Sequence, residues 1–271
     1  MMLKQRVWTA VLLAPLALAG LFLTSSDVFK VFVAGIVLLG AWEWANLSGL
    51  TSLSSRFGYT SLIAALMAAL NYISPQANFI SYLSVAVLFW LIALFWVVRY
   101  PVTGAWSSVW QRALIGVVVL LPCWMGLVSL QSLPSGSALM LMLLLLVWGA
   151  DIGAYFAGKA WGQAKLAPNV SPGKTRAGMW GGLAACAVIA LGFVIYLELA
   201  LLDGVYLLLL AMIAGVASVL GDLFESMLKR HRGIKDSSQL LPGHGGILDR
   251  IDSITSAAPV FVLGVQLLAI S

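Results

Sequence analysis

Charged side chains in this sequence gather between residues 221 and 252. The segment holds five of the ten acidic residues, five of the fifteen basic residues and both histidines. Asp222, Glu225 and Ser226 are spaced i, i+3 and i+4, which places them on one face of a helix. Two carboxylates and a hydroxyl on one helix face are oxygen ligands that suit a hard cation such as Mg²⁺.

A second pair of carboxylates, Asp249 and Asp252, follows at i, i+3 spacing. The nearby basic residues are Lys229, Arg230, Arg232, Lys235 and Arg250. Carboxylates beside Lys and Arg predict a phosphate–Mg²⁺–carboxylate arrangement, because the cation and the basic groups share the neutralisation of phosphate. The alternative is an ion-pair cluster that only fixes the membrane topology. The scarcity of charge elsewhere in the chain favours chemistry.

A glycine-rich turn separates the two carboxylate pairs. Gly245 and Gly246 allow the backbone to approach a ligand closely. His244 is placed to donate to a phosphate or to transfer a proton. Zinc is not expected, because the turn has no neighbouring Cys and no His-x-x-x-His spacing. His231, among basic residues, is expected at the surface.

A second basic motif, Ser-Pro-Gly-Lys-Thr, occupies residues 171–175. It matches only the end of a P-loop, since Pro168 stands where the first glycine is needed and no strand is expected before it. We expect a turn that leads into a helix. Ser171, Lys174, Thr175 and backbone N–H groups there are candidates to receive phosphate. A plain basic loop is an equally good interpretation of this motif alone.

Two further acids lie in apolar surroundings. Asp151, near the inner end of a predicted helix, needs water, a cation or a basic partner, which favours a functional role over helix packing. Glu43, between Trp42 and Trp44, is either an anchor at the level of the lipid headgroups or a functional acid.

The elements that position these residues are predicted to be membrane-spanning helices. The chain is 62% hydrophobic and 9% charged, whereas soluble domains are about one quarter charged. Apolar runs approach the roughly 20 residues that a spanning helix needs. We therefore predict an all-α polytopic membrane protein with about nine spans. They cover residues 7–23, 28–47, 59–73, 79–98, 113–130, 138–157, 178–197, 205–227 and 254–270.

The distribution of basic residues predicts the topology of these spans. Basic residues collect on the cytoplasmic side of bacterial-type membrane proteins. With nine spans, fourteen of the fifteen Lys and Arg residues fall on the side of the N-terminus, Lys30 being the exception. The N-terminus is therefore predicted to be cytoplasmic and the C-terminus outside. We expect N-terminal transmembrane helices over residues 1–130, and a catalytic region over 131–271 with cytoplasmic loops 158–177 and 229–252.

The segment around the second carboxylate pair resembles the signature of phosphatidate cytidylyltransferases, also called CDP-diacylglycerol synthases. The matching positions are Ser226-x-Leu228-Lys229-Arg230, Lys235-Asp236 and Pro242-x-His244-Gly245-Gly246-Ile247-x-Asp249-Arg250-Ile251-Asp252. The resemblance extends to the Asp151 region and to residues 171–175, roughly the C-terminal half. In one departure, Arg176-Ala177 replaces the aromatic-Glu pair that usually follows the Ser-Pro-x-Lys-Thr motif.

The resemblance implies an enzyme of phospholipid biosynthesis that transfers the cytidylyl group of CTP to phosphatidate, giving CDP-diacylglycerol and pyrophosphate. It also implies Mg²⁺, a companion monovalent cation such as K⁺, a homodimer in the inner membrane, and no nucleic-acid partner. The implied catalytic residues are Asp222, Asp249, Asp252, Lys229 and Arg250. The implied substrate-binding residues are Ser171, Lys174, Thr175, Ser226, Arg230, Lys235, His244, Gly245 and Gly246. The implied metal ligands are Asp222, Asp249 and Glu225.

Two other functional classes fit parts of this pattern. A transporter would place its ionisable residues near the membrane midplane and would commonly have two related halves, neither of which this sequence shows. A CTP-dependent polyprenol kinase would instead transfer the γ-phosphoryl group and release CDP. The residues of the signature favour cytidylyl transfer.

Overall fold

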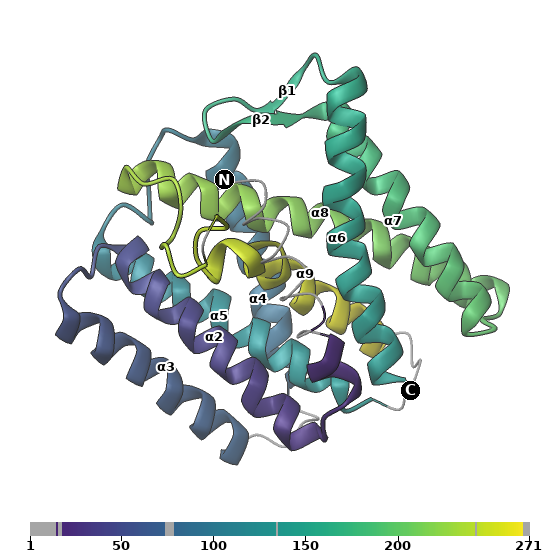
Figure 1. Cartoon of the computed structure of the whole chain (residues 1–271), viewed down its shortest axis with the longest axis horizontal. Helices are drawn as coiled ribbons and strands as arrows, with labels where there is room; N and C mark the ends of the chain where they lie inside the picture. The colour runs from purple at the N-terminus through teal and green to yellow at the C-terminus, as the bar shows by residue number, and fades with distance from the viewer. Residues whose placement is uncertain (1–14, 16–17, 74–78, 134, 242, 268–271) are drawn as a thin grey trace.

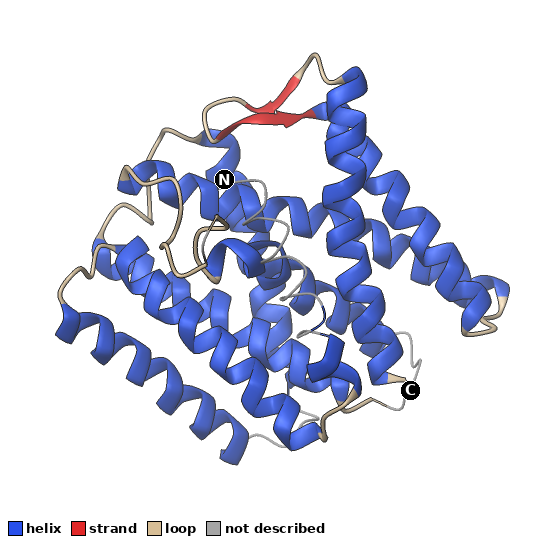
Figure 2. Ribbon diagram, in the orientation of Figure 1, coloured by secondary structure: helices blue, strands red, loops and turns tan. Residues whose placement is uncertain are grey.

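The computed structural model describes residues 15, 18–73, 79–133, 135–241 and 243–267, and most of these residues are helical (Figures 1 and 2). The helices are α2 (Ser26–Ser48), α3 (Leu53–Ile73), α4 (Phe79–Arg99), α5 (Val109–Gln131), α6 (Gly136–Trp161), α7 (Arg176–Tyr196), α8 (Leu201–Arg232) and α9 (Leu248–Leu267). A two-stranded hairpin, β1 (Lys165–Ala167) and β2 (Ser171–Thr175), joins α6 to α7.

Seven helices of the described residues, α2 to α8, are long and apolar enough to cross a membrane. The multi-pass, all-α prediction is therefore confirmed. The predicted span 7–23 lies mostly outside the described residues. Within that span, residues 18–22 are described and helical. The predicted ninth span corresponds to α9, which is not among the seven helices, so the count of nine stays a prediction.

The last helix, α9, occupies the interior of the helical bundle (Figure 1). It packs against α2, α4, α5, α6 and α8, and its residues from Thr255 to Pro259 are all buried. Because protein rather than lipid surrounds it, α9 can carry Ser, Thr and charged residues without exposing them to hydrocarbon. This position explains why a helix of lower hydropathy lies within an apolar bundle.

One end of the bundle brings together the loops that were predicted to be cytoplasmic. Near the start of α5, the Arg112 guanidinium donates to the Ser48 carbonyl at the end of α2, with Nη2–O at 3.0 Å. Its Nη1 lies 3.0 Å from Nε2 of His231, near the end of α8. Arg230 of α8 donates through Nε to the Val170 carbonyl of the hairpin at 3.2 Å. His231 is exposed, as expected, and its ring also contacts Arg112.

The hairpin corrects the prediction for residues 171–175. The motif forms strand β2, antiparallel to β1, instead of a simple turn. Its last residue, Thr175, has extended backbone geometry, and its Oγ1 accepts the Gly178 N–H at 3.1 Å, which caps α7. The motif therefore fixes the start of α7 and holds Lys174 beside the bundle. A P-loop differs, because there the strand precedes the phosphate-binding turn.

Candidate active site

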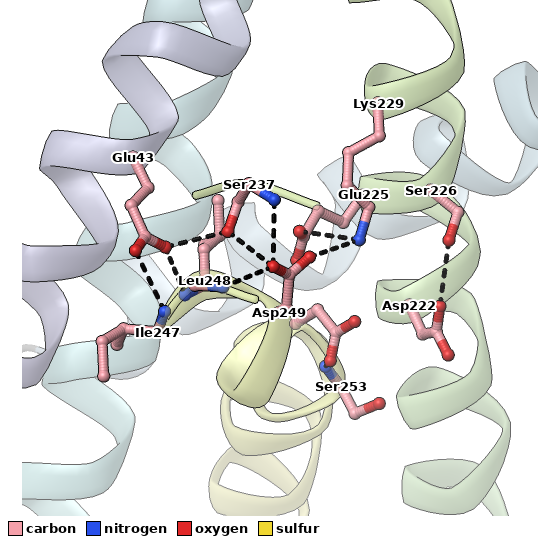
Figure 3. A network of polar contacts seen from close by, with 12 residues as sticks. Glu43, Asp222, Glu225, Ser226, Lys229, Ser237, Ile247, Leu248, Asp249 and Ser253 are labelled. Carbon is pink, nitrogen blue, oxygen red and sulfur yellow. Dashed lines mark hydrogen bonds and ion pairs between the residues drawn. The ribbon is translucent and has the colours of Figure 1, made fainter. Parts of the chain in front are cut away.

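A buried lysine joins α8 to the first turn of α9. Lys229 Nζ lies 2.7 Å from Asp249 Oδ1 and 3.1 Å from Glu225 Oε1. Glu225 and Lys229 are one helical turn apart on α8, and both are less than a tenth exposed. One ammonium group therefore faces two carboxylates in a site with little water. Figure 3 shows Asp249 between α2 on one side and α8 on the other.

The carboxylate of Asp249 is surrounded by donors. Besides Lys229 on Oδ1, its Oδ2 accepts the Gly246 N–H at 2.7 Å and the Ser237 N–H at 2.9 Å. Asp249 lies before residue 254, where the predicted ninth span begins. Burial alone would raise the pKa of Asp249. The Lys229 charge and these hydrogen bonds outweigh burial and hold the pKa below its usual value, so Asp249 is ionised at neutral pH.

A second ion pair joins α8 to the hairpin. Lys174 Nζ of β2 lies 2.7 Å from Asp222 Oδ2, and Ser226 Oγ donates to Asp222 Oδ1 at 3.1 Å. The predicted grouping of Asp222 and Ser226 on one helix face is thus confirmed. The hairpin adds Lys174 to this group, as the sequence could not show. The binding of phosphate by Lys174 stays a prediction.

Close packing of α8 on α9 brings Asp252 toward Asp222. A Cβ at Gly221 would overlap the Asp252 carbonyl and the Ser256 hydroxyl, so only glycine allows this approach. Ser253 donates its backbone N–H to Asp252 Oδ1 at 2.7 Å. Asp252, like Asp249, precedes the predicted ninth span. Burial, and then the negative charge of Asp222, raise the pKa of Asp252, even though the Lys229 charge acts in the opposite direction.

The donor chemistry of this cluster fits a hard cation. Glu225 Oε2 is buried and accepts no hydrogen bond among the described residues. Asp222 and Asp252 are close enough to repel each other, and a cation between them would relieve that repulsion. Among the described residues, no group of three or more Asp, Glu, His or Cys side chains is arranged so that it could hold a metal ion. Lys174 and Lys229 already pair with three of the carboxylates, Asp222, Glu225 and Asp249, so the set of metal ligands stays a prediction.

The glycine-rich turn is built around these carboxylates. Gly245 has φ +80°, a left-handed conformation that other residues adopt only with strain, and a Cβ there would meet Asp249 Oδ2. A Cβ at Gly246 would overlap both Ser237 and Glu43. The His244 N–H donates to the Leu241 carbonyl at 2.9 Å, which closes the turn. The two glycines therefore serve contacts within the protein; contact with a substrate stays a prediction.

A cavity of about 380 Å³ lies beside the Lys174–Asp222 pair, between α6, α7 and the hairpin. Its walls include Asp151, Lys159, Lys174 and Thr175. The structure thus groups Asp151 with the second motif, and its functional role stays a prediction. Ser171 lies in the same hairpin, whereas Lys235 and Arg250 are exposed at the rim of the site.

Sequence reasoning missed one member of the network, Ser237, and left the role of another, Glu43, open. Ser237, which was not a candidate, is buried, and its Oγ lies 2.9 Å from both Asp249 Oδ2 and Glu43 Oε2. Glu43 is only 1% exposed, so it is not an anchor at the headgroups. The only signal for Ser237 in the sequence was its place next to Asp236, between two matched parts of the signature. The spacing of the signature residues gave Ser237 no role.

The chain is similar to known proteins over nearly its full length. Residues 4–268 match the model of the cytidylyltransferase family. A phosphatidate cytidylyltransferase of Pseudomonas aeruginosa is 48% identical, with 96% of each chain covered. Those of Haemophilus influenzae and Bacillus subtilis are 39% and 33% identical, with 96% and 95% of this chain and 97% and 95% of the relatives covered. The site and the similarity over nearly the full length together show that the chain belongs to the cytidylyltransferase family.

Proposed function

We propose that this protein transfers the cytidylyl group of CTP to phosphatidate and releases pyrophosphate. The observation that carries the proposal is the joining of three carboxylates and two lysines from the hairpin, α8 and α9 at one end of an apolar bundle. Relatives with the name of this activity align over nearly their whole length. The product of the reaction is CDP-diacylglycerol, a precursor of membrane phospholipids.

The reaction forms a bond between a phosphatidate oxygen and the α-phosphorus of CTP, and it breaks the bond from that phosphorus to the β-phosphate oxygen. The electron pair of the broken bond leaves with pyrophosphate. The attacking oxygen is already ionised at neutral pH and needs no strong base. Both reactants are anionic, so the protein must neutralise charge and align the two phosphates in line.

Residues at different places in the site would neutralise the phosphates and align them. Lys174, at the cavity, and Lys229, between two carboxylates, supply positive charge where the two phosphates meet. Arg250 and Lys235, exposed at the rim, are placed to draw nucleotide from solution. Bound Mg²⁺, held by Asp222, Asp252 and Glu225 with Asp249 beside them, would polarise the phosphates and offset their charge. Ser226 and His244 are the proposed hydrogen-bonding partners of the substrates.

The end of the bundle at which the site lies supports a proposal for the orientation of the protein in the membrane. The site belongs to the same end as the loops rich in Lys and Arg, which are cytoplasmic in bacterial-type membranes. CTP would then arrive from the cytosol, while the lipid keeps its acyl chains in the bilayer. We propose an inner-membrane protein with a cytoplasmic site, working as a homodimer.

A product assay tests this function. Purified protein in detergent receives phosphatidate, Mg²⁺ and CTP labelled either at the α- or at the γ-phosphate. We expect α-label, and no γ-label, to enter the lipid phase. We expect EDTA to stop the transfer and added Mg²⁺ to restore it. Transfer of γ-label to lipid would show a kinase instead, and folded protein without turnover would reject the proposal.

A further inference from the structure

Glu43, on α2, makes polar contacts between the two halves of the chain. Its Oε1 accepts the Ile247 N–H at 3.0 Å and the hydroxyl of Ser238. Its Oε2 accepts the Leu248 N–H at 2.7 Å. Every one of these donors lies about 200 residues further along the chain, either in the signature loop or at the start of α9. The signature loop is defined here as residues 233–241 and 243–247.

Glu43 accepts hydrogen bonds at the start of α9 from another helix. The first N–H groups of a helix have no partner within the helix, and α9 begins at Leu248. A side chain close in sequence usually accepts these hydrogens, whereas here a carboxylate from another helix does so. Its negative charge also faces the positive end of the helix dipole. Glu43 therefore fixes where α9 starts, one residue before Asp249.

Ser237 connects Glu43 directly to Asp249. Its hydroxyl lies 2.9 Å from an oxygen of each carboxylate, and its backbone N–H also donates to Asp249. A hydroxyl has one hydrogen, so it donates to one carboxylate at a time and holds both oxygens close. Figure 3 shows the resulting path from Glu43 on α2 through Ser237 to Asp249 and Lys229.

From this geometry we infer that Glu43 is a positioning residue of the active site. It holds Ser238 and Ile247 against α2 and orients Asp249 against Lys229. The N-terminal helices thus take part in the reaction through α2, although none of the proposed substrate-binding residues belongs to them. The inference rests on the proposed function where activity is the readout.

The test compares Glu43→Gln with Glu198→Gln, an exposed glutamate between α7 and α8 that serves as the matched control. Glutamine keeps the shape but turns an NH₂ group toward one of the two backbone N–H groups, which cannot reverse their direction. Misplacing a catalytic group by about 1 Å costs on the order of a hundredfold. We therefore expect kcat to fall about ten- to a hundredfold. The KM values for CTP and phosphatidate should change little.

Three readouts separate positioning from mere stability. Hydrogen exchange of residues 233–247 should rise in Glu43→Gln and stay unchanged in Glu198→Gln. In an Asp249→Asn background, Glu43→Gln should lower kcat much less than it does in the wild type. Glu43→Asp, which keeps the charge, should recover part of the kcat. A wild-type kcat and normal loop exchange in folded Glu43→Gln would overturn the inference.

A second variant covers the case in which Glu43→Gln does not fold. Ser237→Ala removes the shared hydroxyl but keeps the backbone N–H that reaches Asp249. We expect kcat to fall severalfold at unchanged KM, and an unchanged kcat would reject the coupling. Loop exchange is measured without substrate, so it tests Glu43 even if the protein fails to transfer cytidylyl groups.

Discussion

At the scale of single residues, Lys229 determines whether the carboxylates of α8 and α9 can lie together. It is 8% exposed and lies within 3.1 Å of both Glu225 and Asp249. Without it, two buried acids face each other with no countercharge. We therefore propose both a structural and a catalytic role for Lys229. A single and a double variant separate the two roles.

Lys229→Met should destabilise the protein by about 3–5 kcal/mol, the usual cost of leaving a buried charge unpaired. Adding Glu225→Gln removes one of the two unpaired acids and should restore part of the lost stability. Neither variant should regain activity, because the positive charge at the phosphates is missing from both. Thermal unfolding in detergent and the labelled-CTP assay measure the two effects. Recovery of activity in the double variant would contradict a catalytic role of Lys229.

The lowered pKa of Asp249 predicts how stability depends on pH. A carboxyl group whose pKa is lower in the folded than in the unfolded protein adds stability above the unfolded value. That stability is lost as the pH falls through the lower folded value. The difference in Tm between wild type and Asp249→Asn should therefore stay constant from pH 8 to 5 and shrink below about pH 4. A difference that already disappears between pH 7 and 5 would show that Asp249 has no depressed pKa.

At the scale of elements, the contact of α8 with α9 sets the distance between Asp222 and Asp252. Gly221 makes this contact possible, because any side chain there would meet the backbone of α9. This close contact lies one residue from Asp222. The separation of the two helices should therefore govern activity more strongly than it governs folding.

Gly221→Ala should lower activity about tenfold or more, since a shift of a few tenths of an ångström separates the two carboxylates. Gly35→Ala on α2 is the control, because a Cβ at Gly35 meets nothing within 4 Å. That change should be neutral or slightly stabilising. Specific activity of folded protein measures both variants. Equal activity of the two variants would show that this close approach is not needed.

At the scale of the whole molecule, the loops that meet at the site end should all face one side of the membrane. A single cysteine replaces Gly104, in the loop after α4, or Asp203, at the start of α8. The native Cys123 and Cys186, which are both buried, are changed to alanine first. A maleimide that cannot cross membranes should label Asp203→Cys in intact cells. It should label Gly104→Cys only after permeabilisation, and the reverse pattern would invert the proposed topology.

Much of this arrangement could be predicted from the sequence. Long apolar runs located α2 to α8, and the spacing of Asp222 and Ser226 placed both on one helix face. The positions of basic residues grouped the loops that meet at the site end. The ends of helices were predicted less well. The last turn of α8 continues five residues past 227, because Arg112 and the hairpin give its basic residues partners.

Long-range partners could not be predicted from one sequence. Glu43 and Leu248 are 205 residues apart, and no periodicity or spacing relates them. The same holds for Lys174 and Asp222, which meet only because the hairpin folds back over the bundle. A short strand such as β2 also leaves no hydrophobic alternation to detect, because its stability comes from pairing with β1 and from the Thr175 cap.

The position of α9 at the centre of the bundle has a consequence for the order of assembly. A ribosome releases α9 after every helix that surrounds it, so α2, α4, α5, α6 and α8 already exist when it emerges. A helix with Asp249, Arg250 and Asp252 in its first turns inserts poorly into lipid by itself. It can instead pack between helices that are already in the membrane. The loop reaches Glu43 only then. On the proposed function the chain is inactive until α9 is in place, because Asp249 and Asp252 lie on that helix.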